Sequence, residues 1–560
     1  MTHVQKCTAR ALLSTCCLLM LVLHACATSS NPPPPQHVQA HATHGGTWID
    51  DLYEDPTSLI PFASPLTTAA IVDQTLYAPL FYGDANGVLH PGLATELPTV
   101  ANGGISADLT SWTFHLRPGL TWNDGQPEDA RDVDFTWRLV TNPAFMAATT
   151  VGLNLIMSDV VSSDHLAITF HLKQAFEPFL AVWADAQAAP LPVHQFSRIA
   201  PDAILKSSEN LDPSVTSGPF LMQESKPGDH YTVVRNPHYY QATQGYPYLD
   251  RMVFRVVPNQ NTILEDLQSA SIDSAWFLDV TKTQAYEQLS TYRLSSNPKS
   301  TNFEAIFFNF HHPILGKYPE IRQAMAMAID HQGLIVAARR GQATPLCTDH
   351  SVALVPGYQP DAPCPRFDVQ AASALLEQHG WIKGPDGVRA KGGARLEFEY
   401  STTSDNAWRN ADELIVQQDF QALGIKIDIQ NYPASTFINR LLDGTYELAE
   451  FEANWGYDAD DSMLFACSQL PPNGFNIVFY CNHQLDTLFL QEQQTLDPAR
   501  RQQIFNAIHQ IYLTDFPFIT LYSPVDLAMH KKSVHNYIPG PEGAAEDNMV
   551  WLWWCDGGQC

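Results

Sequence analysis

Residues 395–451 decide the fold, and they read RLEFEYSTTSDNAWRNADELIVQQDFQALGIKIDIQNYPASTFINRLLDGTYELAEF. At the start of this stretch apolar residues alternate with polar ones, as in a half-buried strand. The apolar positions are Leu396, Phe398 and Tyr400. A helical pattern begins at about Arg409, and Gly424 is placed to end that helix. The stretch therefore opens with a strand followed by a helix.

The second half of the stretch repeats the order. Alternation returns at Ile425, Ile427 and Ile429. Pro433 and Ser435 then begin a short helix that ends at Gly444, and residues 446–451 are extended. The apolar stripe of that helix is Phe437, Ile438, Leu441 and Leu442. Strand, helix, strand, helix, strand predicts a parallel sheet with helices on its faces, and ligands bind such sheets beyond the carboxyl ends of the strands.

The segment at that position is Asn454–Asp461, which reads NWGYDADD. Outside residues 395–451, apolar stripes at helical spacing follow Pro319, Asp368 and Asp497. They predict further core helices and a large α/β protein.

The N-terminus is typical of a secretory signal at residues 1–25. Lys6 and Arg10 precede the apolar run 11–23, which is too short to cross a bilayer comfortably. The run ends in Leu23-His24-Ala25-Cys26, which resembles the lipobox of bacterial lipoproteins and predicts a lipid on Cys26. The alternative is an ordinary cleaved signal in which Cys26 is incidental.

Residues 26–44 are predicted to be a tether, because Pro32–Pro35 and a lack of apolar residues prevent folding. Its histidines recur at helical spacing, which suggests a metal site, but no helix is expected behind four prolines, so a solvated linker is favoured. They are His37, His41 and His44. We expect no metal and no cofactor.

The 560-residue chain carries a net charge of −28, and loss of Lys6 and Arg10 with the signal makes the mature chain more negative. This charge argues against nucleic-acid binding. It serves solubility, or favours cationic and zwitterionic ligands.

Six of the ten cysteines remain after the signal and Cys26 are set aside. An even number in an exported chain predicts disulfides. Proximity in sequence favours Cys347–Cys364, Cys467–Cys481 and Cys555–Cys560, although the sequence leaves the other pairings open.

Three blocks of sequence occur in a specific order. The first is WTFHLRPGLTWNDGQP at 112–127 with DVDFTW at 132–137; the second is SGPF at 217–220 with KPG, RNP and PYLD at 226–228, 235–237 and 247–250; the third is IRQA at 321–324 with AID at 328–330. Together they make the chain, from about Gly45 to about Pro541, resemble family 5 of the bacterial extracellular solute-binding proteins. These proteins deliver peptides, nickel complexes or other solutes to ABC importers.

The resemblance implies a two-lobed periplasmic-binding-protein type II-like fold with an additional domain. Lobe I would comprise residues 45–91, 202–301 and 519–560, the extra domain 92–201, and the second large lobe 302–518. The chain would cross between lobes near Phe307–Phe310 and Phe516–Tyr522. Such a protein is expected to be a monomer, exported to the periplasm or the outer face of the cytoplasmic membrane, and to work with permease subunits.

The resemblance also implies a ligand site at the Asn454–Asp461 segment. In peptide-binding members a Trp lines the pocket, and an Asp three residues later pairs with the ammonium group of the peptide; here Trp455 and Asp458 match, with Tyr457 between them. The alternative is that Asp458 belongs to a loop that caps a helix at Ser462. Glu452 stands where oligopeptide binders carry a basic residue, which argues against binding of a free carboxyl terminus. Further pocket candidates are Trp276, Asn309 and Phe310.

The sequence predicts a peptide-binding protein and not an enzyme, because it has no phosphate loop, HExxH or GxSxG motif. A ligand other than a peptide, namely an oligosaccharide or a nickel complex, is the alternative. A secreted glycoside hydrolase is a more distant one: its acids would be Asp460 and Asp461, but adjacent residues rarely present carboxyls at the ~5–9 Å separation of such mechanisms.

Overall fold

The computed structural model describes residues 42–64, 66–184, 186–296, 300–354, 356–404, 406–471, 474–539 and 549–560. The predicted signal, Cys26 and most of the tether lie outside these residues. No helix within the described ranges is long and apolar enough to cross a membrane.

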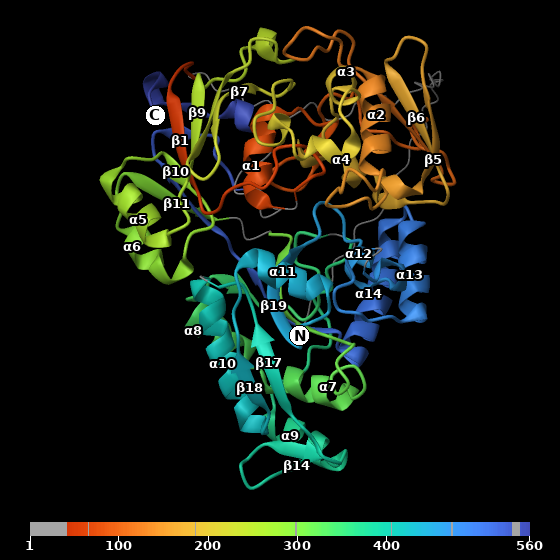
Figure 1. The fold of residues 1–560 in the computed structure, drawn as a ribbon, viewed down its shortest axis with the longest axis vertical. Helices are drawn as coiled ribbons and strands as arrows, with labels where there is room; N and C mark the ends of the chain where they lie inside the picture. The colour runs from red at the N-terminus through yellow and green to blue at the C-terminus, as the bar shows by residue number, and fades with distance from the viewer. Residues whose placement is uncertain are drawn as a thin grey trace, which may run out of the picture. The chain divides into compact units, whose positions relative to one another are not determined.

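The predicted β-α-β-α-β unit is present. Its strands are β17 (Glu397–Ser401), β18 (Lys426–Ile429) and β19 (Leu448–Asn454), and β17 pairs in parallel with both others. The helices between them are α10 (Ala407–Leu423) and α11 (Ala434–Leu442), and Gly424 ends α10 in the left-handed conformation. The local pattern therefore predicted this unit correctly (Figure 1).

The sheet as a whole is mixed, not parallel. Its order is β13-β20-β12-β19-β17-β18, in which β12 (Asn302–Phe308) runs antiparallel to both β19 and β20 (Phe518–Pro524). The edge strand β13 (Ala343–Thr344) is also antiparallel to β20. These strands come from distant parts of the chain, so alternation within residues 395–451 held no information about them.

The apolar stripe of α11 is narrower than predicted. Phe437 and Leu441 are buried, whereas Ile438 and Leu442 are 40% and 36% exposed. Residues four apart lie on the same face of a helix, and the next residue is turned away by about 100°. One pair of the stripe therefore packs on the core, and the other faces outward.

A second sheet has seven strands in the order β11-β21-β10-β1-β9-β8-β7. Its parallel centre is β1 (Thr47–Leu52) between β9 (Arg251–Val256) and β10 (Ser274–Ala275). The other strands are β7 (Phe220–Lys226), β8 (His230–Arg235), β11 (Tyr292–Ser296) and β21 (Leu527–Lys531).

The chain passes between the two sheets twice, from β11 to β12 and from β20 to β21. The first passage precedes Asn302, and the second lies between Pro524 and Leu527. Crossings near Phe307–Phe310 and Phe516–Tyr522 were thus placed wrongly, because those residues form or flank strands inside the six-stranded sheet. The domain boundaries otherwise stay a prediction.

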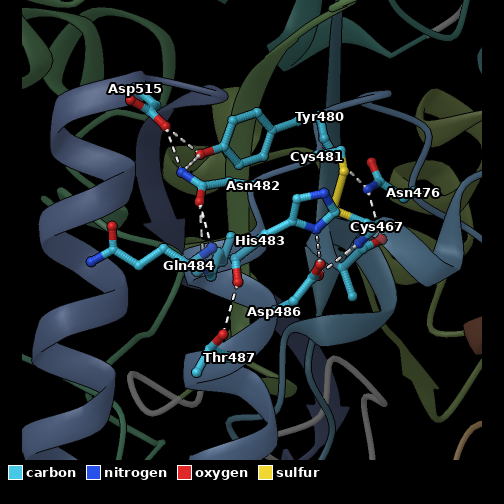
Figure 2. The surroundings of a disulfide bond; sticks show 12 residues. Cys467, Asn476, Tyr480, Cys481, Asn482, His483, Gln484, Asp486, Thr487 and Asp515 are labelled. Atoms are coloured by element: carbon cyan, nitrogen blue, oxygen red, sulfur yellow. Dashed lines mark hydrogen bonds and ion pairs between the residues drawn. A yellow bond between two sulfur atoms is a disulfide. The ribbon is translucent and has the colours of Figure 1, made fainter.

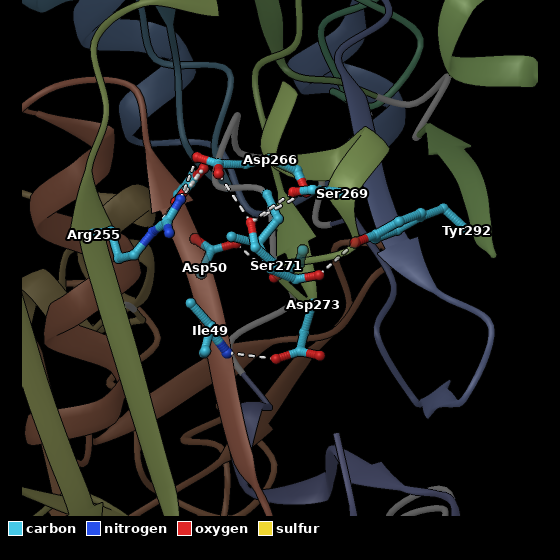
Figure 3. A network of polar contacts seen from close by, with 11 residues as sticks. Ile49, Asp50, Arg255, Asp266, Ser269, Ser271, Asp273 and Tyr292 are labelled. Atoms are coloured by element: carbon cyan, nitrogen blue, oxygen red, sulfur yellow. Dashed lines mark hydrogen bonds and ion pairs between the residues drawn. The ribbon is translucent and has the colours of Figure 1, made fainter. Parts of the chain in front are cut away.

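Arg255 on β9 holds the end of β1 to a neighbouring helix. Its guanidinium binds Asp51 on β1 at 2.7 Å and also Asp266 on α5 (Gln260–Ser269). The backbone of Ile49 donates to Asp273 at 2.7 Å, next to β10 (Figure 3). Burial raises the pKa of Asp51 to about 6, although Arg255 acts against this. These contacts fix the strand ends that lead toward the candidate site.

A three-stranded antiparallel sheet lies within residues 111–172, in the order β4-β6-β5. Its strands are β4 (Ser111–His115), β5 (Ile156–Val161) and β6 (Ala167–Leu172), with α2 (Ala130–Val140) before β5. Its core is aromatic: Trp112, Phe114, Phe170, Phe179 and Trp183 are all buried. The first sequence block is therefore scaffold.

The three helices predicted from apolar stripes are present. They are α7 (Pro319–Ala328), α9 (Val369–Gln378) and α14 (Pro498–Asp515), and the Asp368 and Asp497 side chains cap the last two. The remaining α-helices of the described residues are α1 (Thr67–Leu76), α3 (Val193–Phe196), α4 (Pro201–Ile204), α6 (Thr283–Glu287), α8 (His331–Ala338), α12 (Ser462–Phe465) and α13 (His483–Gln493). Further short strands are β2 (Phe81–Gly83), β3 (Leu89–Pro91), β14 (Ile382–Lys383), β15 (Arg389–Lys391), β16 (Ala394–Arg395), β22 (Val534–His535) and β23 (Trp554–Cys555).

The structure contains the three disulfides that proximity in sequence favoured: Cys347–Cys364, Cys467–Cys481 and Cys555–Cys560. Figure 2 shows the second, which joins the segment after α12 to the start of α13. There the backbone of Cys467 donates to Asp486 at 2.9 Å, and the Asn482 side chain caps α13.

Candidate functional site

Trp455 directly follows the carboxyl end of β19, where the sequence placed it. The residue is only 9% exposed, and its ring stacks on Phe303 with the centroids 5.5 Å apart. Its indole Nε1 donates a hydrogen bond to the carbonyl oxygen of Asp349 at 3.0 Å. Trp455 is thus anchored in its own domain, and it forms the base of the Trp455–Asp461 loop.

Asp458 in this loop is bound by an arginine of the same chain. Both of its carboxylate oxygens accept from the guanidinium of Arg501 on α14, at 2.6 and 2.7 Å. Burial alone would raise the pKa of Asp458, but the charge and hydrogen bonds of Arg501 outweigh burial and lower it. Asp458 is therefore ionised and already paired with a cation.

Arg501 also binds two further carboxylates. It contacts Glu492 on α13 at 2.7 Å and Glu177 at 2.6 Å, so one buried guanidinium holds three acids. Burial, followed by the charge of Asp458, raises the pKa of Glu177 to about 7. Burial also raises the pKa of Glu492 well above its ordinary value. Because three acids share one base, these two carboxyls take up protons readily.

Sequence reasoning missed this cluster. One signal was present, because Arg501 precedes Ile504 and Phe505 by three and four residues and so lies on the apolar stripe of α14. A single arginine on a buried helical face needs acidic partners. Their identities could not be read, since Glu177 and Glu492 belong to other elements.

The Trp455–Asp461 loop contacts residues outside the six-stranded-sheet domain. Tyr457 lies against Gly83 at the end of β2, so closely that a Cβ on Gly83 would be 2.2 Å from the tyrosine ring. Glu177, the partner of Arg501, belongs to the segment after the three-stranded sheet. The loop is therefore part of a junction between domains.

Trp276 lies on the other side of this junction, directly after β10. It is buried, and its ring centroid is 6.0 Å from that of Tyr53, which follows β1. Phe277 extends the cluster to Trp408 on α10, with centroids 4.9 Å apart. The carboxyl ends of parallel strands in both sheets thus lead to the junction, as expected of a ligand site in such sheets.

Asn309 and Phe310, the other predicted pocket residues, lie away from this junction. They follow β12, whose antiparallel register places Phe308 opposite Leu448 and Asn302 opposite Asn454. They therefore lie at the far end of β19 from Trp455, about 20 Å along the strand. The Asn309 amide is also fully used, since it bonds the backbone of Gly444, Tyr446 and His311.

A cluster with more acids than bases lies beside Trp276 and Tyr53. Asn302 donates to Glu452 at 2.6 Å and also lies near Asp526, while Arg409 binds Glu304 at 2.9 Å. We call this the acidic cluster; among the described residues it comprises Glu304, Asp412, Glu450, Glu452 and Asp526 with Arg339 and Arg409.

Burial raises the pKa values of four acids in this cluster, and the charges of neighbouring acids add to the effect; the four are Asp412, Glu450, Glu452 and Asp526. The pKa of Glu452 is well above its ordinary value, with Asp526 and Glu304 as the main neighbours. That of Asp526 is about 6, although Arg339 acts to lower it. The cluster therefore lacks positive charge, and a cation placed there would lower these pKa values.

A cleft of about 530 Å³ adjoins the Trp455–Asp461 loop. One wall comes from residues 151–176 and includes Asn154 and Gln174; the other includes Ser462 and Gln493. Because Ser462 directly follows the loop, the cleft lies beside the loop's C-terminal end. Its size suits a ligand of several residues or sugar units.

Comparison with known proteins agrees with this architecture. The family model described as "Bacterial extracellular solute-binding proteins, family 5 Middle" matches residues 88–476 of this chain. Oligopeptide-binding protein AppA of Bacillus subtilis is 24% identical over 494 residues, which cover 86% of each chain. Glutathione-binding protein GsiB of Escherichia coli K12 is 25% identical over 499 residues, covering 86% of this chain and 90% of GsiB.

Solved structures confirm the fold. AppA of B. subtilis in complex with a nonapeptide has a TM-score of 0.82 at 20% identity, over 92% of this chain and all of AppA. NikZ of Campylobacter jejuni in complex with Ni(L-His) has a TM-score of 0.80 at 21% identity, over 91% of this chain and 99% of NikZ. The fold is thus the two-lobed periplasmic-binding-protein type II fold, and the chain belongs to family 5 of the bacterial extracellular solute-binding proteins, whose members bind substrates for ABC importers.

Proposed function

We propose that this chain captures short peptides, or other ligands with a free ammonium group, and delivers them to an ABC permease. The observation that carries the proposal is the excess of carboxylates over guanidinium groups in the acidic cluster, where the strand ends of both sheets lead. A buried ammonium needs a carboxylate partner to offset its desolvation. The names of AppA and GsiB, an oligopeptide binder and a glutathione binder, support a peptide ligand.

Glu452 and Asp526 are the acids that we assign to the ammonium group. The family resemblance assigns the ammonium group to Asp458. To bind it, Asp458 would have to break or share the two hydrogen bonds that its oxygens accept from Arg501. Glu452 instead has Asn302 as its hydrogen-bonding neighbour and a raised pKa. The negative charge of Glu452 would also repel a peptide carboxylate, so the ligand is held by its amino end.

The ligand itself is identified first, by native mass spectrometry of freshly purified protein. Calorimetry then compares the identified peptide with its N-acetylated form, which has no ammonium group. We expect acetylation to weaken binding at least tenfold, the size of a lost charge-assisted contact. Equal affinity of the two forms would contradict the proposal and favour a neutral oligosaccharide.

Three variants locate the contact. Glu452→Gln should reproduce the loss caused by acetylation, and acetylation should cost Glu452→Gln nothing more. Asp428→Asn, which changes an exposed acid on the edge strand β18 of the same sheet, is the control. If Asp458→Asn, and not Glu452→Gln, removes the sensitivity to acetylation, the ammonium group is held by Asp458.

We also propose that a lipid on Cys26 holds the protein at the outer face of the cytoplasmic membrane. Cys26 lies outside the described residues, so this rests on the Leu23–Cys26 motif. Cys26→Ser should release the mature protein into the soluble fraction. A variant that stays with the membrane as tightly as the native chain would refute lipid anchoring.

The hydrolase alternative has its own test. Incubation of the pure protein with peptides and oligosaccharides, followed by mass spectrometry, should show intact substrates. Cleavage that Asp461→Asn abolishes would overturn the binding-protein proposal.

A further inference from the structure

Two histidines and an aspartate meet in the interior of the six-stranded-sheet domain. Asp349 and His350 lie on the segment after β13, and His509 lies on α14. All three side chains are fully buried. One possible ligand atom from each lies within 4.8 Å of the others.

Three polar atoms of this group have no hydrogen-bond partner among the described residues. Neither oxygen of Asp349 has a hydrogen-bond partner of good geometry among the described residues, and neither does Nε2 of His350. An isolated buried carboxylate is costly unless a cation or several donors compensate it. The geometry thus indicates a missing positive charge beside Asp349.

The two imidazoles point their ring nitrogens at one another. Nδ1 of His350 is 2.9 Å from Nε2 of His509. Nδ1 of His509 lies 3.3 Å from the amide oxygen of Gln359, which can only accept, so the proton of His509 belongs on Nδ1. Nε2 of His509 is therefore left with its lone pair toward His350 and Asp349. A metal-binding histidine commonly has such a carbonyl partner on its other nitrogen.

The separations suit a metal ion. Nε2 of His509 is 2.9 Å from Nδ1 of His350 and 3.7 Å from Oδ1 of Asp349. With metal–ligand bonds of about 2.0–2.1 Å, these separations correspond to angles of roughly 90–130° at the metal. Nitrogen and oxygen donors at such angles are typical of zinc.

A fourth donor is adjacent. Asp461, at the end of the Trp455–Asp461 loop, is buried, and its Oδ2 accepts from Tyr512 while its Oδ1 has no partner. Its carboxyl lies close enough to that of Asp349 for the two groups to interact strongly, so the two carboxyls are neighbours. Two carboxylates and two neutral imidazoles around a divalent cation make a site of zero net charge, the arrangement that burial tolerates best.

We propose that Asp349, His350, His509 and Asp461 bind one divalent transition-metal ion, for which the donor set favours Zn²⁺. A second group of metal-type residues, Cys467, Cys481 and His483, is not a comparable site, because its two sulfurs are joined in a disulfide (Figure 2). The alternative for Asp349 and Asp461 is a single proton shared between their carboxyls.

The ion would connect three segments that carry the candidate ligand site. Asp349 accepts the Trp455 hydrogen bond, Asp461 ends the loop, and His509 lies two turns beyond Arg501 on α14. The Cys347–Cys364 disulfide also anchors the segment that carries Asp349. The metal would therefore be structural, and it would fix the base of the Trp455–Asp461 loop. This inference does not depend on the identity of the solute.

The test uses the untagged mature chain produced in zinc-supplemented medium. Elemental analysis after exhaustive dialysis should find about one Zn²⁺ per chain, and X-ray absorption should show two imidazole ligands. Because the site is buried, the protein is then unfolded in urea with a chelator and refolded with or without Zn²⁺. Refolding with Zn²⁺ should raise Tm by several degrees, since an ion that binds only the folded state stabilises it.

His509→Gln should lose the metal and the Zn²⁺-dependent rise in Tm. His483→Gln, an exposed histidine on α13, should keep both. If His509→Gln does not fold, the metal content and ligand signature of the native chain still decide the question. Native chain with less than a tenth of an equivalent of metal, and a Tm that Zn²⁺ leaves unchanged, would overturn the proposal in favour of a shared proton.

Discussion

Replacement of Arg501 by methionine should destabilise the protein strongly, and in a pH-dependent way. Methionine keeps much of the apolar stem but removes the cation from Asp458, Glu177 and Glu492. The pKa values of Glu177 and Glu492 are already raised, so they can take up protons. Asp458 is the ionised member of the group, and it bears most of the loss.

The magnitude follows from the cost of neutralising Asp458. Protonation of an aspartate of ordinary pKa costs about 4 kcal/mol at pH 7 and about 1 kcal/mol at pH 4.5, at 1.36 kcal/mol per pH unit. Broken buried ion pairs cost a similar ~3–5 kcal/mol. Without Arg501, burial raises the pKa of Asp458 on folding. The protein then loses stability as the pH rises through that raised value. The defect of Arg501→Met should therefore be large at pH 7 and small at pH 4.5.

Urea unfolding at the two pH values measures this, with Arg500→Met as a matched control. Arg500 is the preceding residue on α14 and is exposed, and among the described residues its side chain donates only to Gln503. We expect the control to change the free energy of unfolding by less than about 0.5 kcal/mol. A loss for Arg501→Met that equals the control at pH 7, or that does not shrink at pH 4.5, would refute the reasoning.

Three further predictions follow from single contacts. Gly83→Ala should weaken ligand binding, because its Cβ would lie 2.2 Å from the Tyr457 ring; calorimetry should show no further loss when it is added to Tyr457→Ala. Glu177→Gln should reduce the fall in Tm between pH 5 and 8, since the raised pKa of Glu177, about 7, makes its ionisation destabilising there; equal slopes would exclude this. Thiol titration of the denatured, unreduced mature protein should find all six disulfide cysteines oxidised, and two free thiols would contradict the pairings.

The sequence predicted those parts of the candidate site whose determinants are local along the chain. Trp455 was placed correctly at the carboxyl end of a strand, because the strand, its length and the following loop all lie within one short stretch. The separation of Asn309 from Trp455 was not predictable, because the direction of β12 relative to β19 depends on a pairing between segments about 150 residues apart. Nothing in the pattern of residues 302–308 distinguishes a parallel from an antiparallel strand.

The sequence by itself determined the alternation that builds β17 to β19, the caps and stripes of the main helices, the family, and the cysteine pairs that are close along the chain. These features depend on hydrogen bonds and periodicities that span a few residues. Only the tertiary structure decided which charges meet: Arg501 with Asp458 and Glu177, and His350 with His509. Side chains distant in sequence share a buried space only after the sheets have packed, and burial then makes each pairing count energetically.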